Sequence, residues 1–378
     1  MRPATVPIIG AGIGGLTLAR CLKNNGIQAI IFEKNPSPAR HNYGISLLPR
    51  TCLALQNILK MEEATFRQRV AVDGDVGGKG LVYPEKLHAP KSSESHFRAH
   101  RGRLEGMLRE SLDVEWGHVL ENVSRNGKEY ILDFREKDEV QSTLLVDTSG
   151  VHSPVRNSLL PGTELNILPY VVFRGTRHVA GSAFKTLYEE KFAGGKVLES
   201  RNGDVLLQIS INDVRNAGEG VDISYIYSRP AHPDDQLHRP DREQQQAAEI
   251  SELFFAEASK LGELEQPFKD AFDVQRMRGD RMLHWLMRDI LLPLDQLTNL
   301  AERGVLLIGD AAHATPILGG DGANHAVGDA IQLAEWISSR GAEELGGFYG
   351  EVYAEWEREM KEGEEILAAM HFLSKSSL

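Results

Sequence analysis

The sequence predicts an α/β fold in which a Rossmann-like domain is interrupted by an inserted antiparallel β-sheet domain and followed by a C-terminal helix. Three patterns support this prediction. A strand, a glycine-rich turn and a helix open the chain; a second short strand with a glycine-rich turn comes about 300 residues later; and the segment between them is rich in strand-like runs. With 378 residues, of which 41% are hydrophobic and 25% charged, the chain is long enough for two domains with substantial cores.

The first domain begins with a β-α-β pattern. Val6–Ile9 and Ala29–Glu33 are short apolar runs that we expect to be strands. Between them lie a glycine-rich turn at residues 10–15 and a helical pattern at residues 16–24. Further on, apolar residues recur at helical spacing over residues 103–112. Three more strands are expected at residues 114–123, 130–135 and 143–146.

From about residue 165 to 228 the pattern becomes rich in strands, which we interpret as an inserted antiparallel sheet. The expected strands cover residues 170–174, 185–192, 196–201, 205–212 and 221–227. A connection rich in Pro, His and Asp follows at residues 229–241 and leads into a helix expected at about residues 242–261. We expect this helix to pack against the sheet.

The α/β pattern returns with a strand at residues 304–308, a glycine-rich turn and a helix at about 323–340. A charged helix is expected at about residues 345–373, with Tyr349, Tyr353, Trp356 and Met360 on one stripe. The predicted division is therefore residues 1–164 and 286–340 for the two parts of the Rossmann-like domain, 165–285 for the sheet domain, and 341–378 for the C-terminal helix.

Composition excludes several classes of function. The formal net charge is -12, and no dense run of Lys and Arg is present, so nucleic acid is not an expected partner. Cys21 and Cys52 form neither a disulfide framework nor a CxxC pair, and no metal site is expected.

No segment has the about 18 consecutive apolar residues that are needed to span a bilayer. The apolar stretch at residues 6–22 is Gly-rich and lacks a cleavage site, so it does not read as a signal peptide. A cytoplasmic protein, monomeric or weakly dimeric, is expected.

The first glycine-rich turn has the GxGxxG spacing of a dinucleotide site, with Gly10, Gly12 and Gly15 at the glycine positions. Gly10 permits the tight turn, Gly12 lets the backbone approach a pyrophosphate, and Gly15 allows the helix to pack closely on the strand. The helix N-terminus supplies amides and a favourable dipole. Glu33, 18 residues after Gly15, ends the second strand and can accept hydrogen bonds from ribose hydroxyls. These features do not choose between FAD and NAD.

A second motif favours FAD. The strand at residues 304–308 leads into Gly309 and Asp310, which places the Asp310 carboxylate where it can bind another ribityl or ribose hydroxyl. The turn and helix start that follow contain Gly319, Gly320, Asp321, Gly322, Ala323 and Asn324. Amides of this helix start can face the pyrimidine edge of a flavin and stabilise negative charge there. Two such elements, far apart in sequence, fit one elongated cofactor.

The run from Gly309 to His313, with the glycine-rich turn and Asn324 after it, resembles the para-hydroxybenzoate hydroxylase superfamily. Salicylate hydroxylase, tetracycline-inactivating monooxygenases and many fungal enzymes of natural-product tailoring belong to it. The resemblance covers nearly the whole chain. In this family an Arg-x-x-Leu helix start contacts the flavin, and the match at residues 101–104 nominates Arg101.

The resemblance implies an FAD-dependent monooxygenase in which FAD is bound non-covalently, NADPH or NADH is a transient reductant, and O2 is the co-substrate. No second GxGxxG has a strand and helix around it, so a stably bound nicotinamide is not expected. The substrate would be a small aromatic, enolic or polycyclic compound, such as a natural product, that is hydroxylated or epoxidised. GxSxG, HExxH and P-loop motifs are absent, and no catalytic residue is assigned, because the flavin carries the chemistry in this family.

Two departures from the family pattern stand out. The family has an Asp-Gly followed by Val-His-Ser-x-x-Arg; residues Val151 to Arg156 match the second part, but Ser149 replaces the Asp. That Asp is linked to FAD and nicotinamide binding in the family, so its loss weakens the inference of ordinary NADPH use. Asp147 can substitute only if the turn differs. Pro316 stands one position before the place where relatives commonly have proline.

The predicted site has a cofactor-binding part and a substrate pocket. The predicted cofactor-binding residues are Gly10, Gly12, Gly14, Gly15, Glu33, Lys34, Arg101, Leu120, Asp310, Gly320, Gly322, Ala323 and Asn324. The substrate pocket is expected between the inserted sheet and the turn near Pro316. Its candidate lining residues, chosen by strand position and by that turn, are Arg174, Gln208, Tyr225 and Pro316.

Two alternatives stay open. A flavoprotein of the same fold can carry out dehydrogenation, reduction or halogenation without oxygen insertion, and Ser149 keeps this option open, although the Trp-x-Trp-x-Ile-Pro motif of halogenases is absent. The other alternative is a flavin-binding redox sensor or partner-binding module. The sequence does not identify the substrate.

Overall fold

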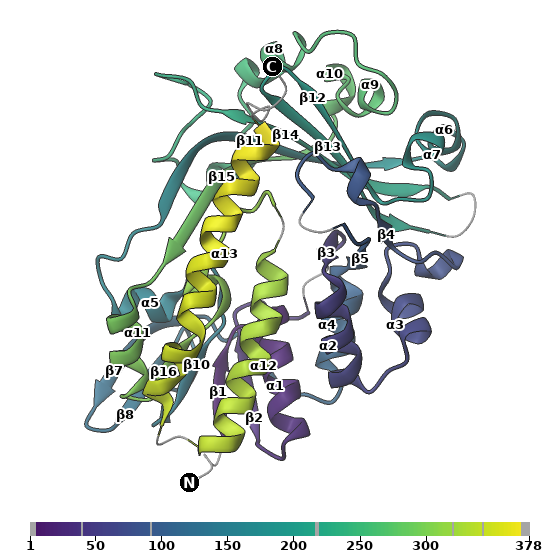
Figure 1. Cartoon of the computed structure of the whole chain (residues 1–378). Coiled ribbons are helices and arrows are strands. Elements are labelled where there is room, and N and C mark those ends of the chain that lie inside the picture. Colours follow the sequence, from purple (N-terminus) through teal and green to yellow (C-terminus); the bar gives the residue numbers. More distant parts are fainter. Residues whose placement is uncertain are drawn as a thin grey trace.

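The protein consists of a parallel sheet with helices packed on it and a large antiparallel sheet at the end of the molecule away from the N-terminus (Figure 1). A computed structural model describes residues 5–38, 41–90, 93–215, 219–319, 321–341 and 344–371. This architecture confirms the predicted α/β fold with an inserted antiparallel sheet and a long C-terminal helix.

The parallel sheet has five short strands. In spatial order they are β16 (Val305–Leu307), β10 (Leu145–Asp147), β1 (Val6–Ile9), β2 (Ala29–Glu33) and β6 (Val114–Trp116). Ile9 pairs with Asp147, and Asp147 pairs with Leu307. The carboxyl ends of β1, β10 and β16 therefore lie next to one another at the same end of the strands. Ligands of open parallel sheets bind at this end.

Helices α1 (Ile13–Asn24) and α12 (Gly322–Arg340) lie side by side on this sheet (Figure 1). Gly14 permits the contact, because a Cβ at this position would lie 3.3 Å from the Cβ of Ala326. The other helices of this part of the molecule are α2 (Pro49–Leu59), α3 (Glu63–Val70), α4 (Arg101–Arg109), α5 (Pro154–Leu159), α11 (Leu294–Ala301) and α13 (Phe348–His371).

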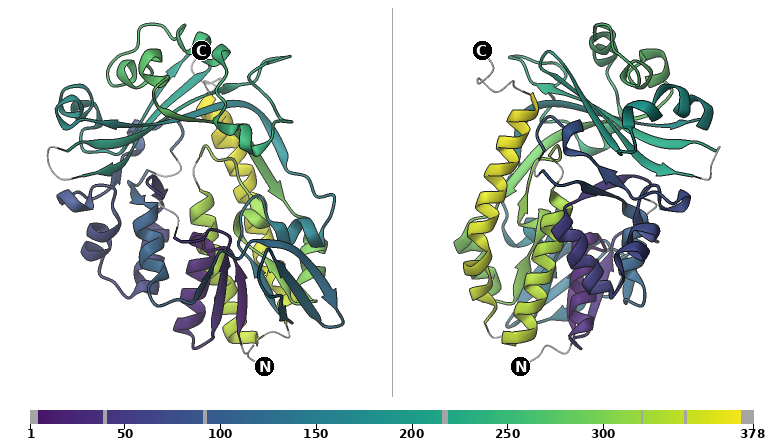
Figure 2. Two further views of the ribbon diagram at one scale, coloured as in Figure 1. Left: turned by 180° about the vertical axis from the view of Figure 1, so that it is seen from behind. Right: turned by 45° about the vertical axis from the view of Figure 1, so that its right-hand side comes forward.

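The antiparallel sheet has six strands, in the order β12 (Val197–Asn202), β13 (Val205–Val214), β14 (Val221–Pro230), β11 (Asn166–Val179), β15 (Arg281–Leu291) and β17 (His313–Ala314). Its outer face is covered by short helices, and its inner face looks toward the parallel sheet (Figure 2). The short helices are α6 (Gly181–Leu187), α7 (Glu189–Phe192), α8 (Glu252–Ala258), α9 (Phe268–Ala271) and α10 (Val274–Met277). In the central strand β14 residues of both faces are buried.

Two smaller sheets complete the described structure. One consists of β3 (Gly44–Leu47), β5 (His96–His100) and β4 (Leu81–Val82), and the other of β7 (Leu120–Asn126), β8 (Glu129–Phe134) and β9 (Val140–Ser142). The first contacts β13 of the antiparallel sheet. It therefore connects the two large sheets.

Three expected elements differ from the structure. The strand expected at 185–192 is helical, because Phe184, Tyr188 and Phe192 recur at a spacing of four and stack on one another. The strand expected at 114–123 is divided between β6 and β7, in different sheets, by a turn at Gly117 with a φ of +71°. The helix expected at 242–261 is reduced to a 3-10 turn and α8, which begins after Ser251.

The predicted boundary at residue 285 falls inside β15, which runs on to Leu291. The division into domains otherwise stays a prediction. No helix in the described ranges combines the length and the apolar character needed to cross a bilayer.

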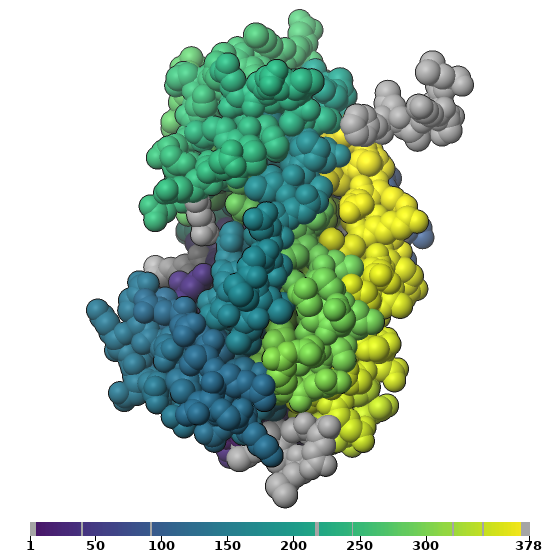
Figure 3. Space-filling model, turned by 90° about the vertical axis from the view of Figure 1, so that its left-hand side faces the viewer, coloured from purple at the N-terminus to yellow at the C-terminus, as the bar shows by residue number. Residues whose placement is uncertain are grey.

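Helix α13 lies along the side of the molecule, with one face exposed (Figure 3). Of its predicted apolar stripe, Tyr349, Trp356 and Met360 are buried and Tyr353 is half-buried. The Tyr349 hydroxyl accepts a hydrogen bond from the backbone N–H of Leu307 at 2.8 Å and donates to its carbonyl at 3.1 Å. Because β16 is an edge strand, α13 satisfies backbone groups that have no neighbouring strand.

Replacing Tyr349 by phenylalanine is expected to lower the free energy of unfolding by about 1 to 3 kcal/mol, because both backbone groups of Leu307 lose a buried partner. Urea unfolding measures this loss. Tyr353→Phe is the matched control on the same helix, since its half-buried hydroxyl makes one hydrogen bond, to the Leu292 carbonyl. Equal stability of the two variants would show that the edge strand does not depend on this cap.

Candidate functional site

The glycine-rich turn between β1 and α1 is shaped to receive phosphates. Gly10 has a φ of +103°, and a Cβ there would lie 2.9 Å from the carbonyl oxygen of Thr148. A Cβ at Gly15 would lie 2.1 Å from the carbonyl oxygen of Gly10. A Cβ at Gly12, in contrast, would meet no atom of the described residues within 4 Å, and no side chain among them caps α1. The turn thus combines open space with uncapped amides, which fits a pyrophosphate.

Glu33, at the end of β2, is buried beside this turn. Its Oε2 accepts a hydrogen bond from the Ala11 N–H at 2.8 Å, and its Oε1 accepts from the N–H and the side-chain amide of Asn35 at 3.0 and 2.6 Å. Lys34 is exposed, and Leu120 has a buried side chain in the main core. Of these three predicted cofactor residues, only Glu33 has its side chain beside the glycine turn.

Asp310 lies in the 3-10 turn Gly309–Ala311 that follows β16. Its carboxylate is next to the start of α12, since a Cβ at Gly322 would lie 3.2 Å from Oδ1. Burial raises the pKa of this carboxyl, and Asp310 has no hydrogen-bond partner within the described part of the chain. A carboxylate in this setting gains from hydroxyl donors, so the residue fits the ribityl chain of FAD.

The substitution Asp310→Ala is expected to weaken FAD binding by about 1 to 3 kcal/mol, the usual range for a charge-assisted hydrogen bond to a hydroxyl. Titration of the apoprotein with FAD, followed by flavin fluorescence, measures the change. The exposed Asp138 provides the control variant Asp138→Ala, for which we expect no effect. Unchanged FAD affinity in Asp310→Ala would mean that this carboxylate has a structural role only.

Helix α12 begins at Gly322, so Gly322, Ala323 and Asn324 form its first turn. The Asn324 side chain joins this turn to β3: its Oδ1 accepts from the Leu48 N–H at 2.9 Å, and its Nδ2 donates to a β3 carbonyl at 3.2 Å. Protein partners thus occupy the Asn324 side chain, which leaves the backbone of the turn for a cofactor. Gly320, also predicted to bind the cofactor, lies outside the described residues.

Arg101 opens α4 directly after β5. Its Nε donates to Glu105 Oε1 at 2.7 Å, and its Nη1 donates to the Tyr43 hydroxyl. The positive charge of Arg101 favours the ionised form of Asp310 and so opposes the rise in the pKa of that carboxyl. Arg101 and Asp310 therefore lie near one another, as expected if both contact one flavin.

The segment after β10 holds its carboxylate inside the protein. Asp147 is fully buried; its Oδ1 accepts hydrogen bonds from the Ser149 N–H at 3.0 Å and from the Ser149 hydroxyl at 2.5 Å, and its Oδ2 accepts from the Ser153 hydroxyl. Burial raises the pKa of Asp147, while these donors favour its ionised form. Asp147 therefore does not take the place of the missing family carboxylate. Ser149 itself lies against Gly10, where a Cβ would be 3.0 Å from the Ser149 Cα.

A buried network supports the turn that carries Asp310. Asp329, on α12, accepts hydrogen bonds from the backbone N–H of Gly309 at 2.7 Å, from His313 Nε2 at 2.6 Å and from Trp356 Nε1 at 2.9 Å. The Trp356 ring also stacks on His313, with 4.0 Å between ring centroids. Three elements, namely α12, β17 and α13, are thus joined behind the cofactor turn.

The antiparallel sheet separates the predicted substrate residues. Arg174 and Gln208 lie on the inner face, where Arg174 donates to Ser224 Oγ at 2.6 Å and Gln208 donates to Glu199 at 2.7 Å. Tyr225 lies on the outer face, in the core formed with the short helices, and its hydroxyl donates to Asp280 at 2.7 Å. Tyr225 thus lies on the face opposite to Arg174 and Gln208, because neighbouring residues of a strand point to opposite faces.

A pair of arginines on this inner side lacks acidic partners. Arg98 donates to Ser46 Oγ at 3.2 Å, Ser210 Oγ at 3.0 Å and the Ile211 carbonyl at 3.3 Å, all of them neutral. Burial and the charge of Arg174 lower the pKa of Arg98 to about 9, so both guanidinium groups stay charged at neutral pH. Neither arginine forms an ion pair with any described residue.

Two aromatic rings lie close to Arg174. Its guanidinium carbon lies 5.3 Å from the ring centre of Tyr43 and 5.3 Å from that of Trp285. Tyr43 also contacts Arg101, so a continuous set of side chains leads from the inner face of the sheet to the region of Asp310. The sequence analysis missed Arg98, Tyr43 and Trp285. The only local signal was a charged residue between the apolar Phe97 and Ala99 of β5, which a surface strand shows equally well.

Pro316 is buried and lines a cavity of about 720 Å³ between the turn after β17 and α13. Further walls come from the start of α2, from the start of α12, and from Ala89, Pro90 and Glu94. Arg174 and Gln208 do not line this cavity. The substrate residues predicted from the sequence thus fall in three places: Pro316 at the cavity, Arg174 and Gln208 on the inner sheet face, and Tyr225 on the outer face.

Comparisons with known proteins agree with this geometry. The family model described as FAD binding domain matches residues 3–167 and 294–344, which contain both cofactor motifs. The chain is 30% identical over 377 residues to the FAD-dependent monooxygenase nscC of Arthroderma otae, covering 94% of this chain and 91% of that protein.

Solved structures share the fold. A putative FAD-containing monooxygenase from Photorhabdus luminescens superposes with a TM-score of 0.71 at 22% identity and covers 99% of this chain and 100% of that one. The tetracycline destructase Tet(55) superposes with a TM-score of 0.69 at 15% identity and covers 99% of this chain and 91% of that one. The two sheets and the C-terminal helix thus form an arrangement found in known flavoprotein structures.

Proposed function

This chain belongs to the FAD binding domain family and is an FAD-dependent monooxygenase, and we propose that it uses NADPH or NADH and O2 to hydroxylate or epoxidise an aromatic or polycyclic compound that binds as a phenolate or enolate. When bound, FAD takes electrons from the nicotinamide and activates O2 for insertion of one oxygen atom. The residues of the chain bind and orient the substrate and exclude water.

The observation that carries the proposal is the Arg98 and Arg174 pair. Two partly buried guanidinium groups that have no carboxylate partner among the described residues are costly in a folded protein, and an anionic ligand would offset that cost. A phenol or enol beside two cations has a lowered pKa, so these residues favour the electron-rich anion, which is the form that accepts an electrophilic oxygen most readily.

The flanking rings supply the second part of substrate recognition. Tyr43 and Trp285 both lie close to Arg174 and offer flat apolar surface to an aromatic or polycyclic ligand. Asn212 and Ser224, on the same inner face, are hydrogen-bonded to each other and add polar groups. A polycyclic substrate is also supported by the similarity to the fungal monooxygenase nscC and, at the level of fold, to a tetracycline destructase.

The proposal is tested with matched pairs of compounds. FAD-loaded enzyme is titrated with phenols and enolic 1,3-diketones, each paired with its O-methyl ether, and binding is followed by the flavin absorbance spectrum. We expect the ethers to bind at least about tenfold more weakly, because they cannot form the anion. Turnover with NADPH under ¹⁸O2 should place one labelled oxygen in the product. Equal affinity for both members of each pair would contradict an anionic substrate, and absence of label from every product would contradict oxygen insertion.

The reductant would dock near the turn that contains Ser149. This turn packs against Gly10 of the dinucleotide turn, and the Ser149 hydroxyl is directed to Asp147. A carboxylate at position 149 would be repelled by the Asp147 carboxylate and would turn outward. The path by which the nicotinamide approaches would then change.

The two free cysteines, both buried, support a reducing compartment, in line with the proposed cytoplasmic location. A monomer or weak dimer stays part of the proposal.

The substitution Ser149→Asp is therefore expected to change the rate of flavin reduction by NADPH at least several-fold and to leave reoxidation by O2 almost unaltered. Stopped-flow absorbance measures the two half-reactions separately. Ser149→Ala is the control, because it removes the hydroxyl without adding charge. Equal effects on both half-reactions, or no effect on either, would count against a nicotinamide site at this turn.

A further inference from the structure

Three side chains that the proposed chemistry does not use converge behind the cofactor turn: His313 of β17, His325 of α12 and Glu359 of α13. We propose that these three residues bind one divalent transition-metal ion of the Zn²⁺ type, which joins α13 to the FAD-binding part of the molecule. The inference does not depend on the proposed substrate. It differs from the expectation, drawn from sequence motifs, that no metal site is present.

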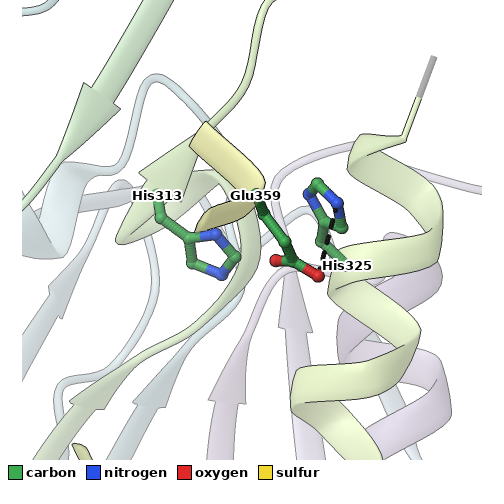
Figure 4. Close-up of side chains that lie close together, drawn as sticks. All are labelled: His313, His325 and Glu359. Carbon is green, nitrogen blue, oxygen red and sulfur yellow. Dashed lines mark ion pairs between the residues drawn. The ribbon is translucent and has the colours of Figure 1, made fainter. Parts of the chain in front are cut away.

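The geometry is close to that of a metal site. Each residue offers one ligand atom, and the three atoms lie within 4.8 Å of one another. His325 Nε2 and Glu359 Oε1 are 3.5 Å apart, near the roughly 3.4 Å that separates two ligands of a tetrahedral zinc ion with bonds of about 2.0 to 2.1 Å. Figure 4 shows the Glu359 carboxylate between the two imidazole rings.

The contacts of His313 leave one ring nitrogen for a ligand. Its Nε2 is 2.6 Å from Asp329 Oδ2, and Asp329 also accepts from the Gly309 N–H and from Trp356 Nε1. The other nitrogen, Nδ1, is buried and has no hydrogen-bond partner in the described ranges. A histidine that donates to a carboxylate through one nitrogen and binds metal through the other is the usual arrangement in proteins.

The surroundings favour a cation. The side chains of His313, His325 and Glu359 are 0%, 6% and 14% exposed. A metal ion would offset the cost of burying the Glu359 carboxylate. Two imidazoles and one carboxylate, without a thiolate, suit Zn²⁺. His325 and Glu359 also line the 720 Å³ cavity, from which water can supply a fourth ligand.

The test uses full-length, FAD-loaded protein that has been dialysed against a chelator and then titrated with ZnCl2 in a calorimeter. We expect one Zn²⁺ per chain. His325→Gln and Glu359→Gln should each weaken binding at least tenfold, since each removes a ligand, whereas His232→Ala, which removes an exposed histidine, should not change it. The FAD content of every variant shows whether the fold is kept, because the cofactor binds only to folded protein.

A second measurement locates the ion. A crystal grown with Zn²⁺ should give an anomalous difference peak between His313, His325 and Glu359. Three results would overturn the proposal: no saturable binding to the wild type, the same affinity in both ligand variants, or a peak elsewhere. In those cases the cluster is a hydrogen-bonded packing contact of α13.

Discussion

Replacing Asp329 by alanine should lower the free energy of unfolding by about 3 to 5 kcal/mol and should also weaken FAD binding. The first effect follows because three buried donors, namely the Gly309 N–H, His313 Nε2 and Trp356 Nε1, lose their acceptor at once. The second follows because the Gly309 N–H fixes the turn in which Asp310 lies. Urea unfolding of the apoprotein and FAD titration measure the two effects separately.

Asp270 provides a matched control in the other half of the molecule. It is also buried, and it accepts hydrogen bonds from the Tyr188 hydroxyl at 2.6 Å and from Arg276. Asp270→Ala should therefore lower stability as well, but FAD affinity should not change, because α9 lies on the outer face of the antiparallel sheet. If both variants bind FAD equally well, the network of Asp329 does not position the cofactor turn.

The glycine-rich turn and the return to the parallel sheet could be predicted from sequence because each is a local signal. The spacing of Gly10, Gly12 and Gly15, and a buried strand that ends in Gly309 and Asp310, both depend on a few consecutive residues. The structure places both motifs at the carboxyl ends of the parallel strands, as a single cofactor requires.

The orientation of the antiparallel strands could not be predicted. Successive residues of a strand point alternately to its two faces. The sequence shows which residues point to the core only where one face is apolar and the other polar. In β14 nearly every residue is buried, because the sheet is covered on both sides. Nothing in the sequence therefore indicated that Tyr225 points outward while Ser224 points to the inner face. Tyr225 is one residue away from the inner-face position of Ser224.

Arg98, the partner of the predicted Arg174, and the proposed metal ligands were missed for a different reason. Arg98 and Arg174 come from different sheets and meet only when β5 approaches β13 and β11. His313, His325 and Glu359 lie on three elements whose contact depends on the packing of α13. Short motifs carry no information about such contacts, so residue type alone gave Arg98 and the three proposed ligands the appearance of ordinary surface or core groups.

The substitution Arg174→Gln is expected to lower kcat/KM for the proposed anionic substrate by roughly 30-fold to 1,000-fold, which corresponds to about 2 to 4 kcal/mol. Loss of one guanidinium leaves Arg98 as the remaining cation near the substrate oxygen, so the enzyme should keep some activity. FAD content should stay the same, because Arg174 belongs to the antiparallel sheet and its hydrogen bond is to Ser224. Steady-state kinetics with a phenolic or enolic substrate measure the change.

The dependence of the rate on pH distinguishes recognition of an anion from a structural role. In the wild type the two cations lower the pKa of the bound phenol or enol, so the reactive anion forms at lower pH. In Arg174→Gln this stabilisation is weaker, and the rising limb of the profile of kcat against pH should move to higher pH. The O-methyl ethers, which cannot ionise, should show no such change in their binding.

Tyr225→Phe is the matched control, because Tyr225 is one residue from Ser224, the partner of Arg174, but points to the outer face and donates to Asp280. This variant should lose some stability and keep both kcat/KM and the pH profile. If Tyr225→Phe lowered kcat/KM as much as Arg174→Gln, the effect of the arginine would have to be assigned to the integrity of the sheet. If Arg174→Gln lowered kcat/KM without moving the pH profile, the guanidinium would position the substrate without stabilising its anion.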